Sequence, residues 1–276
     1  MEIGTAQPTK AERKSIPTHL IGIRSPEETI TAGEYAHLVK HCVADIQERG
    51  MKPIICGGSG LYYRAITKGI FDGSKSDTEI RSKLEMEYNA KGGEVLLERL
   101  TVIDPEYAKI VHQNNRKRLI RALEIYEITG KSPSEHFHTQ EESKSNNVHV
   151  FTIFLNSAMR ELENRIQERT EHMLKNGWIT EVKNLKEKFP EVTLHPLDSI
   201  GYRQILDHLD NKLAYEDMVK EIHLRTRQYA KKQIQWFKNE CCDLTLDVSQ
   251  KTNYAQQIEK IINKWKTLSK KTPETK

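Results

Sequence analysis

The chain has 276 residues and a net charge of +4, with 43 lysines and arginines against 39 acids. Its mean hydropathy is −0.68, and no apolar stretch reaches the ~18 residues of a membrane span, which excludes a membrane-spanning protein. Residues 1–14 lack the apolar centre of a signal peptide, and the four cysteines form no Cys-x-x-Cys pair. We therefore expect a reduced, cytoplasmic protein with no membrane partner.

Two short apolar segments, residues 19–23 and 53–56, predict buried strands. Between them, Thr31 and Glu34 have the spacing of a capping box, and apolar residues recur at helical spacing up to Ile46. Strand, helix and strand in this order predict a parallel sheet with a crossover helix. The expected fold class is therefore α/β.

A glycine-rich turn, Gly-Gly-Ser-Gly at residues 57–60, follows the second predicted strand and precedes a helix over residues 61–66. Backbone amides in such a turn can approach an anion, and the turn places the Ser59 hydroxyl at the carboxyl edge of the sheet. An ordinary tight turn explains the same residues equally well. Both interpretations stay open on the sequence alone.

The middle of the chain predicts short helices without strands. We expect a helical insertion with a return linker over residues 75–145, and an α/β core with C-terminal helices over residues 1–74 and 146–276. A helix over residues 115–129 should bury Leu119, Leu123 and Tyr126 and end at Gly130. Further strands are expected over residues 150–155 and 244–248, and helices over residues 157–173 and 217–238.

Cations crowd the first turns of the helix at residues 115–129: Arg116, Lys117, Arg118 and Arg121. The helix dipole disfavours cations at this end, so the cluster indicates an anionic partner such as a phosphate backbone. A solvated face balanced by nearby acids is the alternative.

A second basic stretch lies on the helix expected over residues 217–238. Arg227, Lys231 and Lys238 share one stripe of this helix. The opposite side is expected to turn inward through four apolar or aromatic residues: Ile222, Tyr229, Ile234 and Phe237. Two basic surfaces would suit a polyanion.

Arg165, Arg169 and His172 fall on one face of the helix at residues 157–173. Paired arginines suit a small phosphate, because guanidinium groups bind phosphate oxygens bidentately. Pairing with Glu161 and Glu168 is the alternative. The histidines and cysteines show no metal-ligand spacing, so the sequence predicts no protein metal centre.

Six segments together resemble the tRNA dimethylallyltransferases, in the family's order along the chain. They are Ile-Gly-Thr-Ala-Gln-Pro at residues 3–8, Cys-Gly-Gly-Ser-Gly-Leu-Tyr-Tyr at 56–63, Arg-Leu-Ile-Arg-Ala-Leu-Glu at 118–124, Arg-Ile at 165–166 with Arg169, Gly-Tyr-Arg-Gln at 201–204, and Thr-Arg-Gln-Tyr-Ala-Lys-Lys-Gln at 226–233 followed by Trp236 and Phe237. The resemblance covers residues 1 to about 238.

The resemblance implies transfer of a dimethylallyl group from dimethylallyl diphosphate to the exocyclic amine of the adenosine 3′-adjacent to the anticodon in tRNA. It implies a P-loop-kinase-like parallel sheet flanked by helices, with an insertion over the anticodon stem-loop and the target base extruded. Ser59 takes the position of a catalytic hydroxyl, commonly threonine in the family, and Arg165 and Arg169 bind the leaving diphosphate. The positions that match tRNA contacts are Arg81, Lys117, Arg118, Leu119, Ile120, Arg121, Asp198, Ser199, Ile200, Gly201, Tyr202, Arg203, Thr226, Arg227, Gln228, Tyr229, Ala230, Lys231, Lys232 and Gln233.

Family members also carry a Gly-x-x-x-x-Gly-Lys-Ser/Thr phosphate loop and an aspartate base before the Ile-Gly-Thr-Ala segment. Neither occurs in this sequence, so we expect the first βα unit to be missing, through truncation or a late start. Mg²⁺ is implied by the resemblance, although its usual ligand segment is among the missing residues. The alternatives are a catalytically inactive tRNA-binding protein and a small-molecule nucleotide kinase. We expect a monomer.

Overall fold

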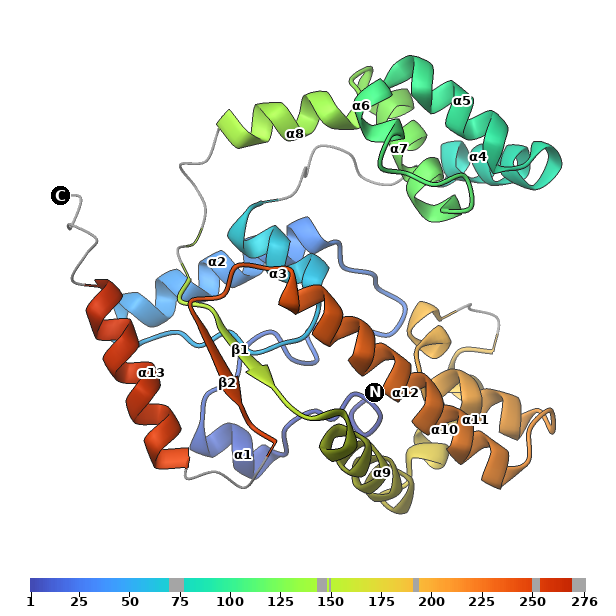
Figure 1. The fold of residues 1–276 in the computed structure, drawn as a ribbon. Helices are drawn as coiled ribbons and strands as arrows, with labels where there is room; N and C mark the ends of the chain where they lie inside the picture. The colour runs from blue at the N-terminus through green and yellow to red at the C-terminus, as the bar shows by residue number, and fades with distance from the viewer. Residues whose placement is uncertain (70–76, 143–147, 149, 191–193, 250–253, 270–276) are drawn as a thin grey trace. The chain divides into compact units, whose positions relative to one another are not determined.

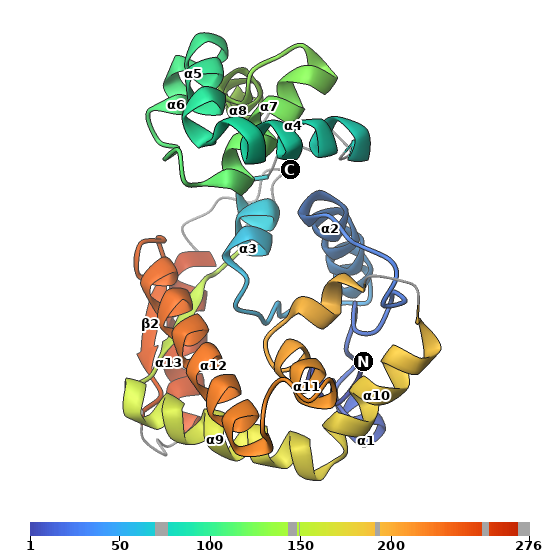
Figure 2. The same ribbon diagram turned by 90° about the vertical axis from the view of Figure 1, so that its right-hand side faces the viewer.

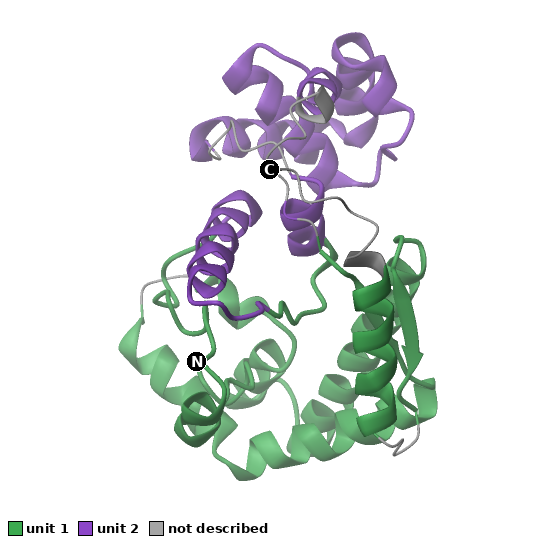
Figure 3. Cartoon of the chain, turned by 90° about the vertical axis from the view of Figure 1, so that its left-hand side faces the viewer, with its two compact units in different colours: residues 1–30, 54–60, 149–276 green, residues 31–53, 61–148 purple. Residues whose placement is uncertain are grey.

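A computed structural model describes residues 1–69, 77–142, 148, 150–190, 194–249 and 254–269 of the chain. The chain forms two compact units, each built from segments that are separate in the sequence (Figure 3). One unit contains residues 1–30, 54–60 and 149–276 and is called here the sheet unit. The other contains residues 31–53 and 61–148 and is called the helical unit.

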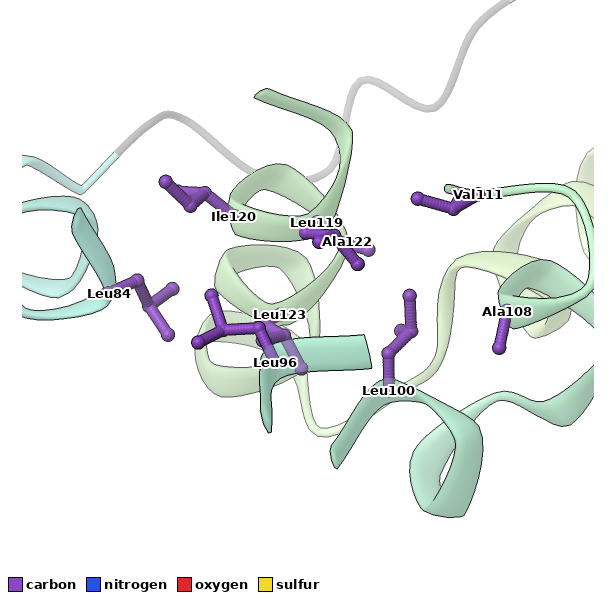
Figure 4. Close-up of a cluster of buried hydrophobic side chains, with 9 residues drawn as sticks. All are labelled: Leu84, Leu96, Leu100, Ala108, Val111, Leu119, Ile120, Ala122 and Leu123. Carbon is purple, nitrogen blue, oxygen red and sulfur yellow. The ribbon is translucent and has the colours of Figure 1, made fainter. Parts of the chain in front are cut away.

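The helical unit is built from helices of 4 to 17 residues around an aliphatic core. Its largest buried cluster gathers leucines of three helices, Leu84, Leu96, Leu100, Leu119 and Leu123, all at most 2% exposed (Figure 4). The element bounds are α2 Ala32–Glu48, α3 Gly60–Thr67, α4 Thr78–Lys91, α5 Gly93–Ile103, α6 Pro105–Ala108, α7 Arg116–Thr129 and α8 Pro133–Glu142.

Local capping signals set the ends of these helices. Thr31 and Glu34 form the predicted capping box of α2, and Asn115 accepts the Arg118 amide at the start of α7. Gly130 ends α7 with φ of 70°, a left-handed conformation that favours glycine. The predicted capping box of α2 and the predicted end of α7 at Gly130 are confirmed, whereas Tyr126, predicted to be buried, is 37% exposed.

The sheet unit pairs two strands in parallel and surrounds them with helices (Figures 1 and 2). The buried core of this unit contains Met173, Trp178, Tyr202, Met218 and Ile222. The element bounds are α1 Lys10–Ser15, β1 Ile153–Asn156, α9 Met159–Lys175, α10 Trp178–Lys188, the 3-10 helix η2 His195–Asp198, α11 Tyr202–Leu209, α12 Tyr215–Lys238, β2 Leu244–Asp247 and α13 Tyr254–Ser269. β1 and β2 pair in register from Ile153↔Leu244 to Asn156↔Asp247.

The parallel sheet is smaller than the sequence predicts. Strands are confirmed at β1 and β2, whereas residues 19–23 and 53–56 form no strand in the described structure. Ile54 is 85% exposed and Ile55 42% exposed, so this segment lacks the two covering faces of a buried parallel strand. The predictions for these two segments are wrong, and the described chain is helix-rich with one parallel strand pair.

The compact units also group the chain differently from the predicted domains. Helix α2 and most of α3 belong to the helical unit, although we expected residues 1–74 to join the core. Part of the expected return linker is helical, as α8. Both expected boundaries, at 74/75 and 145/146, lie outside the described residues, so the division into core and insertion stays a prediction.

Candidate functional site

The turn that carries Ser59 is fixed to helix α12 within the sheet unit. The Gln233 side-chain amide donates a hydrogen bond to the Gly58 carbonyl at 2.9 Å. A Cβ atom at Gly58 would lie 2.4 Å from Gln233 Nε2, and one at Gly60 would lie 2.4 Å from the Trp236 ring. These glycines are therefore required by the close approach of α12, and they leave Ser59 exposed immediately before α3.

The two arginines predicted to bind diphosphate lie on α9, which starts three residues after β1 ends. Arg165 donates through Nη2 to the Val248 carbonyl at 3.2 Å, just beyond the carboxyl end of β2. Its Nε lies 3.4 Å from a Glu161 oxygen, so half of the predicted alternative pairing is present. Arg169 is exposed and makes no ion pair within the described part of the chain. The arrangement brings cations to the carboxyl edge of a parallel pair, where α/β folds bind ligands.

Helix α12 links these two groups. Arg227 forms an ion pair with Glu163 of α9, and six residues further along α12 Gln233 holds the Ser59 turn. Six residues span about 9 Å of an α-helix. The structural role of Gln233 was not predicted, because its partner lies 175 positions away in the sequence.

The remaining candidates on α12 divide into paired and unpaired side chains. Lys220 and Arg225 pair with acids of their own helix, Asp217 and Glu221, whereas Lys231 and Lys232 are exposed without an ion pair in the described structure. Tyr229 is 48% exposed, so the expectation that it turns inward is wrong. Thr226, Gln228 and Ala230 complete the segment, Thr226 donating to the Ile222 carbonyl.

The segment Asp198 to Arg203 is largely structural. Arg203 pairs with Asp198 at 3.2 Å, and the Ser199 hydroxyl donates to the Pro196 carbonyl. Gly201 has φ of 91° and presses against the Trp178 ring. Tyr202 is only 1% exposed, so its side chain packs in the core of the sheet unit, and its predicted role in tRNA binding stays a prediction. Ile200, at 36% exposed, remains at the surface.

Tyr202 belongs to a hydrogen-bonded cluster centred on Glu181. The Glu181 carboxylate accepts the amides of Glu2, Ile3 and Gly4 at 2.6–3.2 Å and the Tyr202 hydroxyl at 2.7 Å. Burial raises the pKa of Glu181, but the hydrogen bonds outweigh it and the pKa is lowered. Burial and the neighbouring carboxylate raise the pKa of Tyr202. Glu181 thus anchors the Ile-Gly-Thr-Ala segment, a role that no local sequence pattern signals.

The residues of α7 that are predicted to contact tRNA lie partly in the core and partly at the surface. Leu119 and Ile120 are 0% and 3% exposed, so their side chains pack in the helical core, and their predicted role in tRNA binding stays a prediction. Lys117 and Arg118 are exposed and have no ion pair in the described residues. Arg116 lies 3.3 Å from a Glu85 oxygen.

Arg81 of α4 and Arg121 of α7 converge on Glu124. Arg81 Nη2 lies 3.0 Å and Arg121 Nη1 2.9 Å from the same carboxylate oxygen, Oε2. Both arginine side chains remain partly exposed, at 43% and 35%, whereas Glu124 is fully buried. The alternative from the sequence, a solvated face balanced by Glu124 and Glu127, is wrong for Glu124 because this carboxylate is buried.

The described residues offer no ready metal cage. No group of three or more His, Cys, Asp or Glu side chains that could hold a metal ion occurs among them. The Mg²⁺ implied by the resemblance therefore stays a prediction. Of the described helices, none is long and apolar enough to cross a membrane.

Fold and site together define a helix-rich protein with one parallel strand pair and exposed cationic helices, a class suited to polyanionic ligands. The IPP transferase family profile matches residues 1–240. The chain is 37% identical over 238 residues to a tRNA dimethylallyltransferase of Syntrophobacter fumaroxidans, covering 86% of this chain and 69% of that protein. It is 39% identical over 239 residues to the tRNA dimethylallyltransferase of Thermotoga neapolitana, covering 86% and 76%. The chain belongs to the IPP transferase family.

Solved structures agree with this assignment. The full-length tRNA isopentenylpyrophosphate transferase of Bacillus halodurans superposes with a TM-score of 0.66 and 32% identity, covering 98% of this chain and 85% of that one. A eukaryotic dimethylallyltransferase acting on tRNA superposes with a TM-score of 0.78 and 27% identity, covering 96% and 69%. The resemblance to tRNA prenyltransferases is confirmed in sequence and in fold.

Proposed function

We propose that this chain transfers a dimethylallyl group from dimethylallyl diphosphate to the exocyclic amine of the adenosine 3′-adjacent to the anticodon in tRNA. The observation that carries the proposal is the Ser59 turn fixed on α12, in the same unit as Arg165 and Arg169. Family membership over residues 1–240 supports it.

In the proposed reaction the adenine N6 atom forms a bond to C1 of the dimethylallyl group while the C1–O bond to diphosphate breaks. The diphosphate leaves with the electron pair, and the amine releases one proton to solvent water. Arg165 and Arg169 stabilise the growing negative charge, because guanidinium groups bind phosphate oxygens strongly. The Ser59 hydroxyl holds the amine by a hydrogen bond. The bond from Arg165 to the Val248 carbonyl orients its side chain.

We propose that tRNA is bound through the exposed cations of both units. Lys117 and Arg118 of α7 and Lys231 and Lys232 of α12 have no ion pair within the described chain, so they are available to backbone phosphates. The target base must leave its stack to meet the Ser59 turn.

The remaining proposals concern the setting of the reaction. We propose that β1 and β2 belong to a P-loop-kinase-like core, because their pairing is parallel, and that the helices around α7 form the tRNA-binding insertion. A monomer and a cytoplasmic location are proposed with them. The four free thiols support the cytoplasmic setting.

The experiment is a transfer assay with radiolabelled dimethylallyl diphosphate and a tRNA transcript. The proposal expects one labelled group per tRNA and none when the target adenosine is replaced by guanosine. Ser59→Ala should lower kcat by about 100-fold. Arg169→Ala should raise KM for dimethylallyl diphosphate and lower kcat. Salt-dependent binding without transfer would instead identify a catalytically inactive tRNA-binding member of the family, and absence of binding would overturn both.

A further inference from the structure

Glu124 is a fully buried carboxylate on α7, the helix that also supplies Leu119 and Leu123 to the aliphatic cluster of the helical unit. Its Oε1 accepts the Asp77 amide at 3.0 Å, and its Oε2 accepts from both Arg81 and Arg121. An unpaired buried charge costs several kcal/mol, and a buried pair stabilises little beyond an apolar core. Stability alone is therefore a weak reason for this arrangement.

The geometry brings two guanidinium groups together at the surface. Because both contact one oxygen, their nearest nitrogens lie within about 6 Å of each other. Arg81 comes from α4 and Arg121 from α7, so the carboxylate between them offsets a repulsion that would otherwise separate the two side chains. Their exposed parts share one surface of the helical unit.

We propose that Glu124 is a positioning residue that holds Arg81 and Arg121 as a two-arginine clamp for one phosphate of the RNA backbone. The inference rests on the proposed binding of tRNA. Each guanidinium carries five N–H donors in a planar fork, and both side chains are partly exposed. The fork matches phosphate oxygens bidentately, and fixing two forks in advance reduces the entropy lost on binding.

The proposal makes a prediction opposite in sign to simple electrostatics. Glu124→Gln removes one negative charge beside the two arginines, so independent point charges would bind RNA more tightly. If Glu124 holds the two arginines in place, Glu124→Gln instead weakens RNA binding, although the net charge of the protein has risen. Glu127→Gln is the matched control, because it makes the same change on the same helix and Glu127 pairs with Arg99, which is outside the predicted contacts.

The test measures the Kd of the full chain for an anticodon stem-loop from 50 to 200 mM salt. We expect Glu124→Gln to weaken binding by about 5–10-fold and to reduce the salt slope by about 1, as for the loss of one phosphate contact. Glu127→Gln should bind within twofold of the wild type or slightly more tightly. Thermal melting of each variant checks that the helical unit is folded.

Charge-preserving variants keep the proposal testable if Glu124→Gln does not fold. Arg81→Lys combined with Arg121→Lys retains both charges but removes the forks, and it should weaken binding by a similar factor. Adding Glu124→Gln to this pair should then change Kd less than twofold. The clamp would be overturned if the wild type binds the stem-loop and either Glu124→Gln or the double lysine variant binds it equally or more tightly. Failure of the wild type to bind would overturn the proposed function instead.

Discussion

Two shielded acids, Glu124 in the helical unit and Glu181 in the sheet unit, are bound by different kinds of donor. In the helical unit, buried Glu124 is bound by two guanidinium groups. In the sheet unit, Glu181 is bound by neutral donors, the backbone amides near the N-terminus and the Tyr202 hydroxyl. The paired cations of α12 contact partly exposed acids instead, as Arg227 does with Glu163.

This difference separates two kinds of basic surface. A cation paired with an exposed acid is held by at most about 1 kcal/mol, so an incoming phosphate can displace the acid. A cation paired with a buried acid stays where it is, because separation would leave the acid unpaired. Arg81 of α4 and Arg121 of α7 are thus held in place, whereas the paired cations of α12 can adjust to a ligand.

The largest expected effect is the loss of stability when a core residue of α7 is truncated. Leu119→Ala should lower the free energy of unfolding by about 3 kcal/mol, because it empties a fully buried site. Urea unfolding followed by circular dichroism measures it. Leu224→Ala on α12 is the control, since Leu224 is 44% exposed and should change stability by less than about 0.5 kcal/mol. An unchanged midpoint for Leu119→Ala would show that this side chain is not a core residue.

The next largest effect is expected at Glu181. Glu181→Gln should lower the free energy of unfolding at pH 7 by about 2 kcal/mol, because four donors lose a charged acceptor. The lowered pKa of Glu181 means that its stabilisation is complete above the unfolded value of about 4.3 and is lost as pH falls through the lower folded value.

Urea unfolding of wild type and variant between pH 7 and pH 3 checks this sign. The two stabilities should converge as the pH falls through the folded pKa. Glu187→Gln, on the same helix but 65% exposed, should stay within about 0.5 kcal/mol of wild type throughout. A difference between wild type and Glu181→Gln that grows toward acid pH would contradict the assignment.

Local signals predicted the helices well and the sheet poorly. The capping residues Thr31 and Asn115 and the terminal Gly130 fix helix ends through neighbours a few positions away. A strand depends on a distant partner, and residues 19–23 and 53–56 have none among the described strands. Apolar composition alone therefore could not distinguish them from β1.

The site shows the same limit. Resemblance identified the segment at residues 118–121 but could not tell that Leu119 packs inward while Arg118 faces solvent. Periodicity did place Leu119 in the core, although it also placed Tyr126 there, which is 37% exposed. The partners of Glu124 and Glu181 lie up to 47 and 179 positions away, beyond the reach of any local pattern.

A third prediction compares the unpaired cations of the two helices. Lys117→Ala with Arg118→Ala should weaken stem-loop binding by about tenfold at 100 mM salt and lower the salt slope by about 2. Lys231→Ala with Lys232→Ala should do the same, and neither pair should alter the melting temperature. Lys220→Ala is the control, because Lys220 pairs with Asp217. Binding that is insensitive to one pair would remove that helix from the RNA-binding surface.

The smallest expected effect tests the adjustable character of α12. Arg227→Ala and Glu163→Ala should each lower the free energy of unfolding by only about 0.5 kcal/mol, because both side chains are partly exposed. Their double-mutant cycle measures the coupling free energy between the two side chains, which should be below 1 kcal/mol in the free protein. If a phosphate replaces Glu163 as the partner of Arg227, this coupling should fall toward zero when the stem-loop is bound. If the coupling persists unchanged in the complex, Arg227 joins α9 to α12 and does not contact RNA. The contrast between the two groups of cations would then rest on Lys231 and Lys232 alone.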